Sequence, residues 1–111
     1  MGTEFVRMYD AQPGATDTTL YTCAANTRVR ILKATATNDT TTATYISFHV
    51  RPLGVASGDA NIVINRKTIG SRETKALWEL EGQVLQATDI LSAIAETASI
   101  ITVHISGMAI T

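Results

Sequence analysis

The chain has 111 residues, of which 45% are hydrophobic and only 17% charged. This length fits a single domain, residues 1–111, and the charged share lies well below the usual value of about 25%. Nine basic and ten acidic residues leave a net charge of −1, so no basic excess can neutralise phosphates and nucleic-acid binding is not expected. Because so few charges cover the surface, part of that surface is expected to contact a partner.

No stretch approaches the roughly 18 apolar residues that a membrane span needs, and the N-terminus lacks the pattern of a signal peptide. We therefore expect no membrane association. Gly2-Thr3-Glu4-Phe5 matches the translation of common restriction sites, so residues 1–5 can be read either as partly a cloning remnant or as native chain.

Cys23 is the single cysteine, so an intrachain disulfide cannot form. Its neighbours in the run Leu20-Tyr21-Thr22-Cys23-Ala24 predict a small buried side chain, not a nucleophile. The absence of a disulfide suits a reducing compartment.

In the first third of the chain, β-branched residues and turn signals predict strands over residues 5–9, 19–23 and 28–37. Gln12-Pro13-Gly14 closes the first strand, and Ala25-Asn26 separates the second from the third. In the third strand the alternation slips at Ile31-Leu32, which predicts a β-bulge.

Asn38-Asp39 is a predicted turn, and residues 44–51 form the clearest strand before Pro52 ends it. A loop over residues 53–60 precedes a strand over 61–65, and Gly70-Ser71 is the next turn.

Two later stretches, residues 71–81 and 88–96, fit either a helix or a strand, and the Thr-rich context with short, turn-separated runs favours strands. The last strand covers residues 99–105. Ser106-Gly107 interrupts it in the manner of a bulge, and residues 108–111 continue it.

About eight short strands with short connections predict an all-β fold, an antiparallel β-sandwich resembling a jelly roll. Period-two spacing assigns ten side chains to the core. They are Ile46, Phe48, Val50, Ile62, Ile64, Trp78, Leu80, Ile101, Val103 and Ile105.

The side chains that could carry chemistry form no recognisable site. His49 and His104 are the only histidines, and they could approach each other if their strands pair, but zinc needs three or four ligands. No Gly-x-Ser-x-Gly elbow supports a Ser-His-Asp triad. Glu79 and Glu81 share one face of a predicted strand, where a solvated edge is a better interpretation than paired acid–base catalysts. We therefore expect no catalytic residue, no cofactor site and no metal site.

Three stretches resemble small structural proteins of tailed bacteriophages and prophages. They are Leu20-Tyr21-Thr22 with Ala25-Asn26-Thr27-Arg28-Val29, Leu80-Glu81-Gly82-Gln83-Val84-Leu85 with Asp89-Ile90-Leu91-Ser92-Ala93, and Ala98-Ser99-Ile100 through Ser106-Gly107. The loop from Arg51-Pro52-Leu53-Gly54 to Ala60-Asn61 is similar too. The resemblance covers roughly residues 19 to 110, and family members often have Pro-Gly where this chain has Ala87-Thr88.

This resemblance implies a β-sandwich component of a virion assembled in host cytoplasm, such as a capsid decoration (cement) protein or a neck or tail protein. It transfers no functional residue. We expect a non-enzymatic module that forms a homo-oligomer, with a trimer favoured, and that binds capsid or tail proteins. Two alternatives stay open: a receptor- or glycan-binding module, and a small jelly-roll enzyme.

Overall fold

The structure is a computed structural model that describes residues 2–111. Its elements are almost all strands, as the composition predicted. The strands are β1 (Thr3–Ala11), β2 (Thr18–Thr22), β3 (Arg28–Asn38), β4 (Thr44–Arg51), β5 (Ile62–Ile69), β6 (Glu73–Ala76), β7 (Val84–Leu85), β8 (Ile90–Ala95) and β9 (Ile101–Ile110), with one short 3-10 helix, η1 (Asp59–Asn61).

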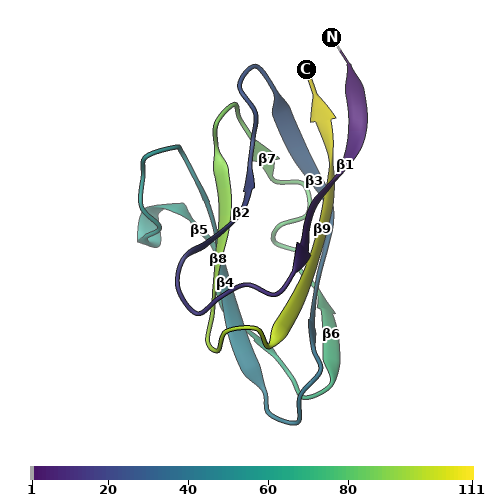
Figure 1. Ribbon diagram of the computed structural model, residues 1–111, viewed down its shortest axis with the longest axis vertical. Coiled ribbons are helices and arrows are strands. Elements are labelled where there is room, and N and C mark those ends of the chain that lie inside the picture. Colours follow the sequence, from purple (N-terminus) through teal and green to yellow (C-terminus); the bar gives the residue numbers. More distant parts are fainter. Residues whose placement is uncertain (1) are drawn as a thin grey trace.

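The strands form two antiparallel sheets that face each other (Figure 1). In the first, here called sheet A, the order is β1-β9-β3-β6, and β7 also pairs with β3. In the second, sheet B, the order is β2-β8-β4-β5. The pairs β1/β9, β2/β8, β3/β6 and β4/β5 nest inside one another along the chain, which is the jelly-roll arrangement. Since β6 and β7 share one position beside β3, the sandwich has eight strand positions, and the predicted fold class is confirmed.

The core lies between the two sheets and contains most of the predicted side chains. Ile46, Phe48, Leu80, Ile101 and Val103 are fully buried. Ile64 and Ile105 are buried to almost the same extent, whereas Val50 and Ile62 are half-buried.

Trp78 is the one clear error in the predicted core, because its side chain is 71% exposed. The expected strand over residues 71–81 ends at Ala76, and the chain continues in consecutive turns. Turn geometry sends residues 77 and 80 inward together, so Leu77 and Leu80 are both fully buried. Leu77 N–H also donates to Ala34 O at 2.9 Å, which anchors this segment to β3.

The bulge expected at Ser106-Gly107 lies on the neighbouring strands instead. β9 continues without interruption to Ile110, while β1 shifts register between Arg7 and Tyr9 and β3 shifts between Ile31 and Lys33. The slip predicted at Ile31-Leu32 is therefore confirmed. Gly107 permits this close packing, because a Cβ at this position would lie 2.5 Å from Arg30 O and 2.9 Å from Met8 Sδ.

Several strand ends also differ from the expected ones. The strand expected over residues 61–65 extends to Ile69, past a bulge at which Arg66 has a φ of 52°. The short β7 was missed, because two residues carry no periodicity. At the N-terminus, β1 pairs with β9 along its whole length, and Gly2 O accepts a hydrogen bond from Thr111 N at 2.9 Å.

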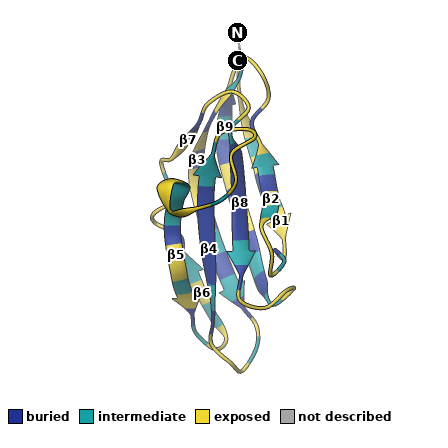
Figure 2. Ribbon diagram, turned by 90° about the vertical axis from the view of Figure 1, so that its left-hand side faces the viewer, coloured by how far each residue is buried: buried dark blue, intermediate teal, exposed yellow. Residues whose placement is uncertain are grey.

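The loop between β4 and β5 folds back over the outer face of sheet B (Figure 2). Arg51 anchors it by donating to Val55 O at 2.8 Å and to the Asp17 carboxylate at 3.1 Å. Ser57 adds a second link, since its hydroxyl donates to Asp17 at 2.9 Å and lies 3.2 Å from Ser92 Oγ. These hydrogen bonds link the exposed loop to Arg51, to Asp17 and to Ser92 of sheet B.

Candidate functional site

The two histidines do not meet. His49 is on β4 in sheet B, where it is buried and its Nδ1 lies 2.9 Å from Asn61 Oδ1. His104 is on β9 in sheet A, where it is exposed and its Nδ1 lies 3.2 Å from the Asp10 carboxylate. Because the two strands belong to different sheets, the pairing that would have brought the imidazoles together does not occur.

The polar network under the β4–β5 loop holds serine, histidine and aspartate side chains close together. Asp17 accepts hydrogen bonds from Ser57 and Arg51, and His49 bonds to Asn61 instead of a serine. Within residues 2–111 neither histidine is hydrogen-bonded to a serine hydroxyl, which is the contact that an activated nucleophile needs. The network therefore serves to hold the loop.

The two glutamates lie in the turns after β6 and face different partners. Glu79 forms an ion pair with Lys67 at 3.0 Å, and the hydrogen bond from Lys67 lowers the pKa of Glu79. Glu81 Oε2 accepts from Ala34 N at 3.4 Å. Each carboxylate thus has a structural contact of its own, and the two do not form an acid–base pair.

Cys23 is buried, as predicted, with 1% of its surface exposed. Its Sγ lies 3.2 Å from Thr27 O, and burial raises the pKa of the thiol, with a further contribution from the charge of Asp89. Residues 2–111 contain no group of three or more His, Cys, Asp or Glu side chains that could hold a metal ion. Nor does any helix in this part of the chain have the length and apolar character to cross a membrane.

The feature with the clearest potential for function is the outer face of sheet A. At the end near the chain termini, apolar side chains follow one another from strand to strand. Phe5 on β1 is opposite Met108 on β9, Met108 is opposite Arg30 on β3, and Arg30 is opposite Val84 on β7. Ile110 lies one outward position further along β9. We call Phe5, Val84, Met108 and Ile110 the apolar row.

The members of the apolar row are accessible, and arginines separate them. Phe5 is 80% exposed, Val84 44% and Ile110 36%. Arg28 lies opposite Ile110 and Arg30 opposite Met108. Aromatic residues, Met and Arg are the side chains enriched at protein–protein interfaces.

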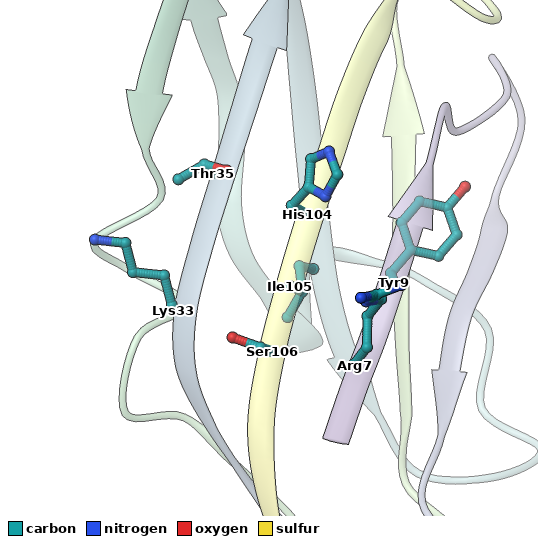
Figure 3. Close-up of a pocket in the computed structure, with 7 residues that line it drawn as sticks. All are labelled: Arg7, Tyr9, Lys33, Thr35, His104, Ile105 and Ser106. Atoms are coloured by element: carbon teal, nitrogen blue, oxygen red, sulfur yellow. The ribbon is translucent and has the colours of Figure 1, made fainter. Parts of the chain in front are cut away.

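Beside the apolar row, the same face contains a shallow hollow of about 210 Å³ (Figure 3). Arg7 and Tyr9 line it from β1, Lys33 and Thr35 from β3, and His104 and Ser106 from β9. Asp10 forms an ion pair with Arg7, at 3.5 Å, and its carboxylate also lies 3.2 Å from His104 Nδ1.

Charge is distributed unevenly between this face and the rest of the molecule. The outward strand positions of sheet A carry four of the nine Lys and Arg residues, namely Arg7, Arg28, Arg30 and Lys33, and one acidic residue, Asp10. The remaining five Lys and Arg residues share the rest of the chain with nine acidic residues. A chain of nearly zero net charge therefore has one cationic face.

Sequence reasoning missed this face. The alternation of Arg28, Arg30 and Lys33 was visible as an exposed strand face, and it was the available signal. The alternation in the sequence does not reveal the strand order, which places β3 beside β9 and β9 beside β1.

No family model matches the chain, and no curated protein matches it. Among solved structures, a chain from the structure of infectious bursal disease virus Gx strain is similar, with a TM-score of 0.48 and 11% sequence identity. The similarity covers 97% of this chain and 31% of that one, so this chain spans less than a third of the other's length. A similarity of this size supports no inference about function.

Proposed function

We propose that this protein is a non-enzymatic structural module of a tailed-phage virion, which self-associates and decorates a capsid or joins the neck or tail. We infer the self-association from the apolar row. Four apolar side chains that lie together on a sheet face, separated by arginines, match the composition of protein interfaces. The assignment to a phage particle is supported by the resemblance of residues 19 to 110 to phage structural proteins, and it is an analogy.

The charge of the face bears on how copies would meet. In a twofold dimer a patch contacts the same patch on the other copy. Two copies of this face would then bring Arg28 and Arg30 against their equivalents, which is unfavourable. A head-to-tail contact avoids this repulsion, and it closes into a ring when the rotation between copies is a whole fraction of a full turn. We therefore propose a trimer in preference to a dimer.

Light scattering coupled to size-exclusion chromatography, across a dilution series, tests this proposal. We expect a particle of about three times the 11.9-kDa chain mass. The interface between its copies should bury at least about 1,000 Å², as lasting interfaces do. Met108→Glu should reduce the particle to a monomer, since it places a charge in the middle of the apolar row. The matched control is Leu53→Glu, which adds the same charge at an exposed apolar residue in the β4–β5 loop.

A wild-type chain that elutes as a monomer at micromolar concentration would contradict self-association. If Leu53→Glu dissociates the particle and Met108→Glu does not, the interface lies at the loop and not at the apolar row.

A further inference from the structure

The hollow beside the apolar row has several polar groups that the chain itself leaves unused. Within residues 2–111, the Lys33 ammonium and the hydroxyls of Tyr9, Thr35 and Ser106 make no internal hydrogen bond or ion pair. Lys33 lies at the β3 margin of the hollow and Arg7 at the β1 margin, with His104 and Ser106 between them (Figure 3). These groups are donors of the kind that bind a carboxylate.

One carboxylate is already held at this place. Asp10 contacts both Arg7 and His104, which shows that these two donors can face one acidic side chain together. Lys33, on the opposite margin, forms no ion pair with any residue that the structure describes. We propose that the hollow receives a second carboxylate, supplied by an acidic segment of a partner protein, and this proposal goes beyond the self-association described above.

The size of the hollow favours a side chain over a small-molecule ligand. At about 210 Å³ it is smaller than the roughly 300 Å³ at which ligand pockets begin. A Glu or Asp side chain needs less room than a cofactor. The chain has a net charge of −1 and so no basic excess to neutralise a run of phosphates, which makes a protein carboxylate the better match.

A different protein fits better than a second copy of this chain, because most acidic side chains here already have partners. Asp17, Asp39 and Glu79, for example, are in ion pairs with Arg or Lys. Within residues 2–111 the acidic residues without a hydrogen bond or ion pair are Glu4 and Asp59. The cationic face is therefore complementary to an acidic surface from outside.

The test uses the full ¹⁵N-labelled chain and a fluorescein-labelled hexaglutamate peptide at low salt. We expect the peptide to shift the amide signals of Lys33, His104 and Ser106. Fluorescence anisotropy should show that Lys33→Glu weakens binding by at least about fivefold, which is the scale of a reversed charge pair at a surface. Arg72→Glu, the same charge change at an exposed site outside the face, should change binding by less than about twofold.

Three results would overturn the proposal: no shift at these amides, equal losses for Lys33→Glu and Arg72→Glu, or tighter binding of a 12-nucleotide oligothymidylate at the same residues. Lys33→Met, which keeps the apolar stem, serves as a second variant should Lys33→Glu fold poorly.

Chromatography of each variant separates the two proposals. A wild-type monomer that binds the peptide at the hollow refutes the trimer alone, and a trimer with no shift at the hollow refutes this inference alone.

Discussion

At the residue scale, the inner faces of the sandwich are occupied by aliphatic side chains with one aromatic ring among them. Phe48, at the middle of β4, is fully buried and is the largest side chain of the core. It lies opposite Ile64 on β5 and Ala93 on β8. The small Ala93 leaves room for the ring, so Phe48 fills the space between the sheets at this level.

We predict that Phe48→Ala reduces the free energy of unfolding by about 3–5 kcal/mol, because the change removes a buried ring and leaves a cavity. Chemical denaturation monitored by circular dichroism measures the loss. A change below about 1 kcal/mol would mean that Phe48 does not fill the core.

Cys23 leads to a prediction about pH. Burial, and to a lesser degree the charge of Asp89, raises the pKa of the thiol. The folded state therefore favours the neutral thiol, and its contribution to stability is fully present below the thiol pKa of the unfolded chain. That contribution is lost as pH rises through the folded pKa.

We expect iodoacetamide to label Cys23 at pH 8 at least about ten times more slowly in the folded protein than in denaturant, because the thiolate is scarce and shielded. Mass spectrometry follows the labelling. Burial also raises the pKa of Tyr9 and Tyr21, so Cys23→Ala is the control for stability at alkaline pH. The variant should lose less stability than the wild type between pH 8 and pH 10, and equal losses would contradict a role for the thiol.

At the element scale, β9 is the strand around which sheet A is organised. It pairs with β1 on one side and with β3 on the other, and both neighbours bulge close to Gly107. Each bulge adds a residue that the straight β9 does not match. The close approach of Arg30 O to Gly107 is possible because glycine has no Cβ.

Gly107→Ala should lower the free energy of unfolding by about 1–3 kcal/mol, as expected for an extra carbon in a packed site. The Cβ would meet backbone, which cannot rotate away. Gly58→Ala is the matched control, since a Cβ there has no neighbour within 4 Å. Similar denaturation midpoints for the two variants would show that sheet A yields easily at Gly107.

The turn between β7 and β8 contains a strained residue. Asp89 N–H donates to Gln86 O at 3.0 Å, and Thr88, the third residue of this turn, has a φ of 68°. A β-branched residue is unfavourable in this left-handed region. Such a turn prefers Pro-Gly at the two positions that Ala87 and Thr88 occupy here.

Thr88→Gly is therefore predicted to raise the free energy of unfolding by about 1 kcal/mol, the strain relieved at one such residue. Thermal and chemical denaturation both measure it. Thr97→Gly is the control, because Thr97 is exposed in a loop and does not have a positive φ. That control should be neutral or destabilising, and a destabilised Thr88→Gly variant would contradict the strain.

At the scale of the whole molecule, the hydrophobic core is the feature that holds the two sheets together. It runs through both sheets, and side chains from β3, β4, β8 and β9 contribute most of it. No cluster of metal-binding side chains crosses between the sheets within residues 2–111.

We predict that a chelator leaves the melting temperature unchanged, because residues 2–111 contain no group of three or more side chains that could hold a metal ion. Thermal melts with and without EDTA are the measurement. A drop of several degrees in EDTA that added zinc or calcium reverses would show that a metal contributes to stability after all.

The strand positions and the inner face could be predicted from the sequence because both depend on local information. Period-two alternation identified β4 with its exact limits, Thr44–Arg51, and placed Phe48 and Ile46 in the core. The breaks at Pro52 and Gly70-Ser71 were also readable from the chain, since turn residues act through their own backbone preferences. The same reasoning failed at Trp78. There, three consecutive turns replace the strand, so buried residues are spaced by three positions instead of two.

The face proposed for interaction was decided by tertiary structure. The apolar row and the hollow take residues from β1, β3, β7 and β9, which lie up to 105 positions apart in the chain, from Phe5 to Ile110. Strand order and register bring them together, and both depend on long-range pairing that no local pattern encodes. The separation of His49 from His104 has the same cause, since the sheet to which each strand belongs is determined only when the whole jelly roll has formed.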